Sequence, residues 1–377
     1  MAVINGTNGA DTLNGTSEDD QINGLDGNDL IKGSAGADKI DGGTGSDTVD
    51  YSASAEAISA EIRPGTSVAG VGGDSQGDTL TAIEKIIGSA FNDTFTAAAI
   101  SYATFEGGSG DDVYFVNGGG VTVIEQAGGG NDEVRVSYKE HTLAANVERL
   151  TYVGTETFTG YGNAIDNIIT GGNGNDTLLG GGGADQFFGG AGMDTVSYDD
   201  STVGVTLNLK TGVNSGIGAG DTYNSIEAIT GSKYNDTFIA DGRVFAFNGG
   251  AGTDTVDYSN SDAAINVDVR PGIGLAGTGG DAQGDTLAAI EKVIGSAFND
   301  TFTAAAISYA TFEGGAGDDV YFVNGGGVTV IEQTGGGNDE VRVSYKEHTL
   351  AANVERLTYV GTETFTGYGN AIDNIIT

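Results

Sequence analysis

Aspartate recurs at a fixed spacing near the N-terminus of this 377-residue chain. Residues 6–50 form five successive nonamers, and each begins with glycine and carries aspartate at its sixth place. An ionised carboxylate only accepts hydrogen bonds, so it requires donor groups or a cation beside it. The aspartates at the sixth place are Asp11, Asp20, Asp29, Asp38 and Asp47.

The other residues of each nonamer predict a turn followed by a short strand. Glycine at the first and usually the fourth place allows positive φ and close backbone approach, which favours a six-residue turn. The last three residues predict a strand in which only the eighth side chain points inward. If each turn reverses the chain, two nonamers form one coil, and residue i lies over residue i+18 at about 4.7–4.9 Å. The eighth places hold Leu13, Ile22, Ile31, Ile40 and Val49.

This stacking brings carboxylates above one another, with Asp11, Asp29 and Asp47 along one edge and Asp20 and Asp38 along the other. Two unit charges about 4 Å apart repel by about 1 kcal/mol in water and roughly 4 kcal/mol at an effective dielectric of 20. A cation between the coils removes that cost. The chain has no cysteine, and the nonamers hold no histidine. An oxygen-only donor set with a flexible shell favours Ca²⁺ over Mg²⁺.

Nonamers such as GTNGADTLN and GLDGNDLIK resemble the repeat of the RTX family, the hemolysin-type calcium-binding repeat proteins. This nonamer is the known signature of that family. The resemblance implies an all-β fold, a parallel β-roll or β-solenoid with several Ca²⁺ ions held between successive turns. It also implies export by type I secretion, so that the protein folds outside the cell.

Further nonamers occur later in the chain. Residues 171–197 supply three in succession, with Asp176, Asp185 and Asp194 at the sixth place. Four aspartate pairs at the 18-residue spacing are expected to hold ions: Asp11/Asp29, Asp20/Asp38, Asp29/Asp47 and Asp176/Asp194. Single nonamers lack such a partner by this count, and we expect about half of them to hold a complete site; their aspartates are Asp93, Asp112, Asp236, Asp254, Asp300 and Asp319.

In two related nonamers asparagine replaces the sixth-place aspartate, at Asn167 and Asn374. Asparagine removes one negative charge, so we expect these turns to stack with little or no metal.

The chain is built from duplications, because residues 47–170 recur at 254–377. We therefore expect an RTX run at 1–50, an irregular solenoid module at 51–170, a second run at 171–197, a short diverged module at 198–253 and a duplicate module at 254–377. Between nonamers lie strand-like pieces of wider coils. In residues 139–150, apolar residues fall at helical spacing, but the flanking strand-like residues favour a strand, a turn and a second strand.

Composition limits the partners and the location. With 15 Lys and Arg against 53 Asp and Glu, the net charge is −38, which argues against binding nucleic acid or an anionic membrane. An acidic, glycine-rich chain could be disordered, but here apolar residues make up 38% and are periodic. No apolar run approaches the roughly 20 residues of a membrane span. Met1 leads directly into the first nonamers, so we expect no N-terminal signal peptide. The type I secretion that the resemblance implies needs none, and it leads us to expect an extracellular or cell-surface protein.

Catalytic candidates are few, and we expect no enzyme within these residues. Residues 73–77 (GDSQG) fit the nucleophile-elbow pattern around Ser75, but the internal copy has Ala282 there. His141 and its copy His348 have no second histidine nearby for a zinc site, and we expect both at the surface.

The sequence therefore predicts a calcium-binding repeat protein with a structural or adhesive role, in a surface layer, a biofilm or a fibre. The alternative is the non-catalytic repeat region of a secreted RTX enzyme, such as a protease, lipase or alginate epimerase. Expected partners are Ca²⁺, cell-surface or matrix components, and further copies of the chain. Ile375–Thr377 repeats Ile168–Thr170, which a nonamer follows, so one chain's last coil could accept another's first coil, head to tail.

Overall fold

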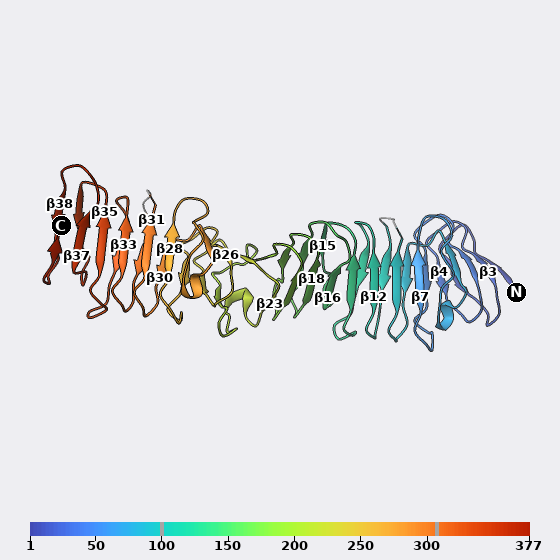
Figure 1. The fold of residues 1–377 in the computed structure, drawn as a ribbon. Helices are drawn as coiled ribbons and strands as arrows, with labels where there is room; N and C mark the ends of the chain where they lie inside the picture. The colour runs from blue at the N-terminus through green and yellow to red at the C-terminus, as the bar shows by residue number, and fades with distance from the viewer. Residues whose placement is uncertain (99–101, 306–308) are drawn as a thin grey trace. The chain divides into compact units, whose positions relative to one another are not determined.

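The computed structural model describes residues 1–98, 102–305 and 309–377. It contains two compact units, Met1–Gly192 and Met193–Thr377. In each unit, short strands stack in parallel ladders, as the labelled strands of Figure 1 show. The prediction of an all-β parallel β-roll is confirmed.

The nonamer runs form the predicted coils. Each strand begins at the seventh residue of its nonamer and spans the last three; β2, for example, is Thr12–Asn14, while β20 (Gln186–Gly190) runs on past its nonamer. Thr12 pairs with Leu30 and Leu30 pairs with Thr48, which is the predicted spacing of 18 residues. The eighth-place side chains are buried, because the pleat turns only that residue of each strand toward the interior.

The strands of the first unit fall into four parallel sets. The first set is β1 (Val3–Asn5), β3 (Gln21–Asn23), β5 (Lys39–Asp41) and β8 (Thr79–Thr81). The second is β2, β4 (Leu30–Lys32), β6 (Thr48–Asp50), β9 (Lys85–Ile87), β11 (Thr104–Glu106) and β13 (Thr122–Ile124). The third is β7 (Ser59–Ile62), β10 (Thr94–Ala97), β12 (Val113–Val116), β14 (Glu133–Val136), β16 (Arg149–Tyr152), β18 (Ile168–Gly172) and β20 (Gln186–Gly190). The fourth is β15 (Glu140–Thr142), β17 (Thr159–Tyr161) and β19 (Thr177–Leu179).

The second unit is built in the same way. One set is β21 (Thr195–Ser197), β24 (Ala228–Thr230), β26 (Ala246–Asn248) and β29 (Thr286–Ala288). A second is β22 (Thr206–Asn208), β25 (Thr237–Ile239), β27 (Thr255–Asp257), β30 (Lys292–Ile294), β32 (Thr311–Glu313) and β34 (Thr329–Ile331). A third is β28 (Asn266–Val269), β31 (Thr301–Ala304), β33 (Val320–Val323), β35 (Glu340–Val343), β37 (Arg356–Tyr359) and β39 (Ile375–Ile376). The remaining strands are β36 (Glu347–Thr349), β38 (Thr366–Tyr368) and β23 (Thr222–Asn224).

Coil length varies outside the nonamer runs. Lys39 pairs with Thr79, 40 residues later, because the intervening segment carries β7 and the short 3₁₀ helix η1 (Gly73–Ser75). Equivalent 3₁₀ turns in the second unit are η2 (Gly216–Gly218) and η3 (Gly280–Ala282). The strands on either side of such an insertion still pair in parallel.

The ambiguous stretch at residues 139–150 folds as β15, a turn and β16, so the prediction of strand, turn and strand is confirmed. Asn146 adopts a φ of 65° in that turn, a conformation that asparagine tolerates. Leu143, Val147 and Leu150 are all buried, so the helix-like spacing arises from two strands and a turn that bury side chains in one core.

Aromatic side chains fill the wider coils. The Phe95 ring stacks on Tyr114 at 5.1 Å and on Phe105 at 5.2 Å between centroids. Tyr51, Tyr198 and Tyr258 are also buried. Among the described residues, no helix has the length and apolar character needed to cross a membrane.

Candidate metal centres

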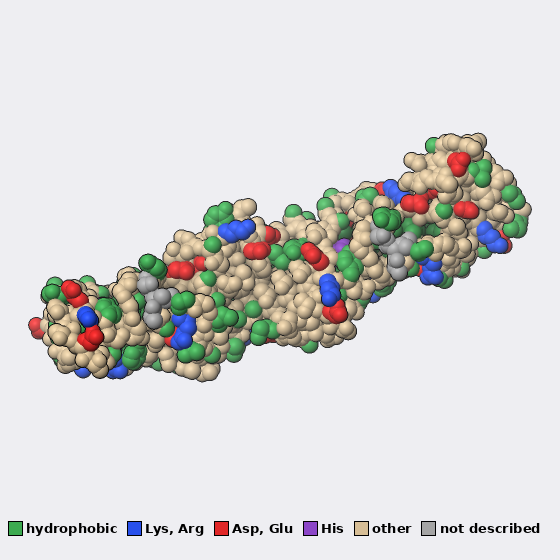
Figure 2. All heavy atoms as spheres, turned by 90° about the horizontal axis from the view of Figure 1, so that it is seen from above, with side chains coloured by type: hydrophobic (Ala, Val, Ile, Leu, Met, Phe, Trp, Pro, Cys, Tyr) green, Lys and Arg blue, Asp and Glu red, His purple; other side chains and the backbone are tan. Residues whose placement is uncertain are grey.

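The sixth-place aspartates lie in the turns, directly before the strands. In the structure all of them are buried except Asp11, which is half-buried. Acidic side chains on the face drawn in Figure 2 are scattered in small groups, several beside a Lys or Arg. Much of the negative charge is therefore inside the coils, where solvent screens it least.

One oxygen of each carboxylate joins adjacent coils. The backbone N–H of Asp11 donates to Oδ1 of Asp29, that of Asp20 to Asp38 and that of Asp29 to Asp47, each at 2.8 Å. The carboxylates therefore stack along two edges in the predicted columns. This bond fixes the orientation of each side chain and leaves Oδ2 to find its own partner.

A first group, the capped aspartates, satisfies Oδ2 within its own nonamer. The second residue of these nonamers is Ser or Thr, and its N–H or hydroxyl donates to Oδ2. Thr16 N–H, for example, lies 2.8 Å from Oδ2 of Asp20, and Ser296 N–H lies 2.6 Å from that of Asp300. The capped aspartates are Asp11, Asp20, Asp38, Asp93, Asp236 and Asp300.

A second group, the open aspartates, has a buried Oδ2 with no hydrogen-bond partner in the described parts of the chain. They are Asp29, Asp47, Asp112, Asp254 and Asp319. The second residue of each nonamer has positive φ, from 82° to 107°, at Leu25, Gly43, Gly108, Gly250 and Gly315. The residue at the second place thus separates the two groups, because a left-handed residue there does not cap the carboxylate.

Glycine at the first place brings the open oxygen close to a carbonyl of the next coil. A Cβ on Gly24 would lie 2.3 Å from Oδ2 of Asp29 and 2.4 Å from the carbonyl oxygen of Gly42. At Gly249, the distances are 2.5 Å to Oδ2 of Asp254 and 2.1 Å to the Ala289 oxygen. Without a donor for Oδ2, acceptors that converge on one point favour a proton or a cation between them. The residues present fit Ca²⁺, which accepts carboxylate and carbonyl oxygens in a flexible shell.

Asn167 and Asn374 carry an amide in place of the carboxylate. Nδ2 of Asn167 donates to the carbonyl oxygen of Val147 at 3.0 Å, and Nδ2 of Asn374 donates to that of Val354 at 3.0 Å. Their Oδ1 atoms accept the N–H of Asn163 and of Asn370, each at 2.8 Å, so both ends of each amide have a partner. Little or no metal at these turns stays a prediction.

The sequence reasoning missed the acidic residues that continue the columns beyond the nonamers. Asp38 N–H donates to Oδ1 of Asp78, and Asp47 N–H donates to Oε2 of Glu84, both at 2.8 Å. Other such residues are Asp132, Glu148, Glu227, Asp285, Glu291, Asp339 and Glu355. Their common signal is an acidic residue immediately before a strand, which a search for glycine-first nonamers does not detect.

These bonds correct the expectation that single nonamers lack stacked partners. Asp93 N–H donates to Asp112, Asp236 N–H to Asp254 and Asp300 N–H to Asp319. The first and third pairs are 19 residues apart, so a search at a spacing of 18 misses them, whereas Asp236 and Asp254 are 18 apart. Asp176 and Asp194 belong to different units, and each is buried in its own.

Two acidic residues of the columns are capped by tyrosine. The Tyr51 hydroxyl donates to Oδ2 of Asp78 at 2.8 Å, and the Tyr258 hydroxyl donates to Oδ2 of Asp285 at 3.1 Å. Burial raises the pKa of both carboxyls to about 7. At these positions a buried tyrosine hydroxyl is therefore the hydrogen-bond donor to Oδ2.

In calcium-free buffer, lowering the pH from about 8.5 to about 5.5 is expected to increase the β-structure. Burial raises the pKa of Asp112 and Asp319 from 3.8 to about 8, and that of Asp254 to about 6. A folded-state pKa above the unfolded value contributes stability that is complete below pH 3.8 and is lost as pH rises through about 6 to 8. Saturating Ca²⁺ should reverse the trend, since protons compete for the ligands. A circular dichroism signal that stays flat across this range without calcium contradicts the prediction.

The catalytic candidates have structural partners. Ser75 is buried, and its hydroxyl lies 2.9 Å from the Gly72 carbonyl oxygen and 3.1 Å from that of Val71. His141 is half-buried, not fully at the surface as expected, because Nδ1 lies 2.5 Å from the Tyr138 hydroxyl. Burial lowers the pKa of His141 to about 4.

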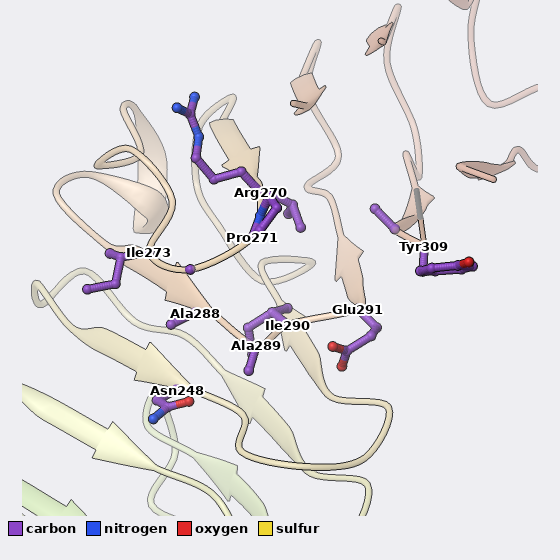
Figure 3. A pocket seen from close by; sticks show the side chains of 12 residues that line it. Asn248, Arg270, Pro271, Ile273, Ala288, Ala289, Ile290, Glu291 and Tyr309 are labelled. Carbon is purple, nitrogen blue, oxygen red and sulfur yellow. The ribbon is translucent and has the colours of Figure 1, made fainter. Parts of the chain in front are cut away.

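A hollow in the second unit lies beside β29 and is lined mainly by apolar side chains, among them Ile273, Ala288 and Ile290 (Figure 3). Its charged residues, Arg270 and Glu291, stand on opposite sides of it. Arg270 pairs with Asp268, and Glu291 accepts the Asp254 N–H. Both charged groups therefore already have a partner within the coils.

Ser75 is expected to resist serine-reactive fluorophosphonate probes in the calcium-loaded protein, because its hydroxyl is buried and already donates to backbone carbonyls. Ser75→Ala reproduces the residue of the internal copy, Ala282. It should lower the free energy of unfolding by about 1 kcal/mol, the worth of one hydrogen bond. Stoichiometric labelling of Ser75, read by mass spectrometry, would overturn this expectation.

Comparison with known proteins gives a repeat-family match over parts of the chain and two partial relatives. Residues 5–31, 14–49 and 161–196 match the RTX calcium-binding nonapeptide repeat. The endo-1,3-1,4-beta-glycanase ExsH of Rhizobium meliloti (strain 1021) is 37% identical over 114 residues, which cover 30% of this chain and 23% of ExsH. The endo-1,3-1,4-beta-glycanase EglC of the same organism is 37% identical over 87 residues, 23% of this chain and 18% of EglC. The chain spans less than a quarter of the length of these curated relatives.

Proposed function

We propose that this chain, which carries RTX calcium-binding nonapeptide repeats, is an extracellular β-roll that folds on Ca²⁺ and serves a structural or adhesive role. The observation that carries the proposal is the set of open aspartates, whose buried oxygens face backbone carbonyls without a donor. The sixth-place aspartates are the candidate ligands, and we propose that the open ones hold the ions, because the Oδ2 of a capped aspartate is already bonded within its own nonamer. Surface layers, biofilms and fibres are the settings that such a module suits.

Calcium dependence also supports an extracellular location. Extracellular calcium modules bind with dissociation constants of about 10⁻⁴–10⁻³ M. Cytosolic Ca²⁺ is far below that range, so the chain would stay unfolded in the cell and fold after export. The proposed modules are residues 1–50, 51–170, 171–197, 198–253 and 254–377, and the last repeats the second almost without change.

A non-catalytic role is supported by the partners of the candidate residues. Ser75 and His141 are hydrogen-bonded within the framework, and neither lies beside a group that would activate it among the contacts described. The chain itself is proposed not to be an enzyme. Head-to-tail association of copies stays a prediction.

The alternative is the repeat region of a longer secreted enzyme. It is favoured by one observation: both curated relatives carry the name of a glycanase, and each match covers under a quarter of the relative. In that case the calcium-loaded roll would be an accessory region that folds and holds a separate catalytic domain outside the cell.

Binding assays on the purified chain separate these functions. The chain, labelled with a fluorophore and loaded with Ca²⁺, is incubated with cells of its source and, separately, with barley β-glucan. Calcium-dependent retention on cells without affinity for the glucan supports the adhesive role. Retention by the glucan in affinity electrophoresis supports the accessory role, and reading the gene on both sides of this segment would show whether a catalytic domain is attached. Retention by neither, with intact folding, contradicts adhesion.

A further inference from the structure

Three carboxylates meet inside the wider coils of the first unit, outside the residues that match the nonapeptide repeat. Asp112 precedes β12, Glu125 follows β13 and Asp132 precedes β14. One oxygen of each lies within 4.8 Å of the others. The second unit repeats the arrangement with Asp319, Glu332 and Asp339.

Each of the three side chains has an oxygen without a partner. Asp112 and Asp132 are fully buried and Glu125 is 7% exposed. Oδ2 of Asp112, Oε2 of Glu125 and Oδ2 of Asp132 accept no hydrogen bond within the described parts of the chain. The ion pairs there involve none of the three, and the nearby Arg135 binds Glu133 instead. Three carboxyl groups are therefore buried together without a counter-charge, and ionising all three is costly unless a cation joins them.

The backbone is shaped to admit these oxygens. A Cβ on Gly107 would lie 2.2 Å from Oδ2 of Asp112 and 2.4 Å from Oε1 of Glu125. A Cβ on Gly129 would lie 2.8 Å from the Gly108 carbonyl oxygen and 3.3 Å from Oε2 of Glu125. Carbonyl oxygens thus stand beside the carboxylates, and glycine is required where they converge.

The glutamate is held in place from both ends. The Tyr114 hydroxyl donates to Oε1 of Glu125, which leaves Oε2 unpaired. Nδ2 of Asn146 donates to the Glu125 carbonyl oxygen at 2.9 Å. In the second unit, Tyr321 and Asn353 hold Glu332 in the same way. A glutamate fixed in this manner is pre-organised to bind an ion, because its side chain does not have to change conformation on binding.

We propose that each triad, Asp112/Glu125/Asp132 and Asp319/Glu332/Asp339, binds one Ca²⁺ ion at a site of a second type. A between-turn site relies on one carboxylate per coil and backbone carbonyls, whereas the triad supplies three carboxylates. Hard ions prefer such an all-oxygen set, and trivalent lanthanides bind it for the same reason. The proposal rests on the calcium-dependent fold but not on the adhesive role.

The test compares bound calcium in the full chain with that in the double variant E125Q/E332Q. Equilibrium dialysis at saturating Ca²⁺ is expected to give two fewer ions per chain for the variant, and tyrosine-sensitised Tb³⁺ luminescence is expected to fall. The variant D20N, at a capped aspartate, serves as the control and should keep both ions and luminescence. An unchanged ion count in a folded E125Q/E332Q variant overturns the proposal, while a wild-type chain that binds no Ca²⁺ would overturn the proposed function as well.

A second variant covers the case in which E125Q/E332Q fails to fold. Y114F/Y321F keeps all six carboxylates and removes the phenol that touches each glutamate. Tyrosine next to a bound Tb³⁺ transfers excitation to it, so this variant should lose part of the luminescence per bound ion, with the ions counted by equilibrium dialysis. Luminescence per bound ion equal to that of the wild type would overturn the proposal.

Discussion

In excess EGTA at neutral pH the chain is expected to lose its β-structure, and millimolar Ca²⁺ is expected to restore it. The open aspartates bury negative charge, which a bound cation offsets far better than partial protonation does at this pH. At free Ca²⁺ about tenfold above the dissociation constant, each ion stabilises the fold by roughly 1.4 kcal/mol. Five open aspartates holding one ion each would contribute about 7 kcal/mol, comparable to the whole stability of a typical domain.

Far-UV circular dichroism measures this directly. Mg²⁺ at the same concentration is the control, and it should restore much less structure because it demands a tighter octahedral shell. A chain that is already β-rich in excess EGTA, with no change on adding Ca²⁺, would refute calcium-dependent folding.

Replacing an open aspartate should have opposite effects with and without calcium. In Asp47→Asn, the new amide would face the Ala82 carbonyl oxygen, which lies beside Oδ2 of Asp47 at the Gly42 α-carbon. Its Nδ2 would then donate to that carbonyl, which has no such donor beside the carboxylate. The variant should therefore be more stable than the wild type in EGTA and less stable, by about 1.4 kcal/mol or more, in saturating Ca²⁺.

The matched control is Asp20→Asn at a capped aspartate. Oδ2 of Asp20 accepts bonds from the Thr16 N–H and hydroxyl, so the amide would lose an acceptor there. Stability should fall by about 1 kcal/mol regardless of calcium. Urea unfolding of both variants across a Ca²⁺ titration decides the matter, and identical calcium dependence for the two would contradict the division into open and capped aspartates.

The nonamer runs could be predicted almost completely from the sequence. Every coil there has 18 residues, so the eighth-place residues, the three-residue strands and the columns of aspartates follow from one count. Ile22 and Ile31 are fully buried, and Asp29 lies over Asp11 as predicted. Short-range periodicity suffices where no insertion changes the length of a coil.

Where coil length varies, the sequence count fails. Glu84 stacks over Asp47 across 37 residues, since a strand and a 3₁₀ turn are inserted between them. Glu125 lies in no nonamer, and only the folded coils bring it to Asp112. The division into capped and open aspartates was also missed. Its signal is in the sequence: Ser or Thr stands at the second place of a capped nonamer, and glycine stands at that of an open one. Leu25 is the exception, because it is left-handed without being glycine.

The duplicated module shows which features persist together. After Gly88 the two copies differ only at Ser109/Ala316 and Ala127/Thr334. Both substitutions lie in turns next to the carboxylate triads, yet the triads have the same geometry in each unit. The acidic residues and the glycines between them therefore define the sites, and the neighbouring side chains are free to vary.

Anomalous diffraction from crystals grown with Ca²⁺ and soaked in Tb³⁺ tests the central claim most directly. The account predicts anomalous peaks between coils beside Oδ2 of Asp29, Asp47 and Asp254 and within the two carboxylate triads. It predicts no peak beside the capped Asp20, Asp93 and Asp300. Ordered coils with no peak at the open aspartates, or with equal peaks at capped and open ones, would contradict it.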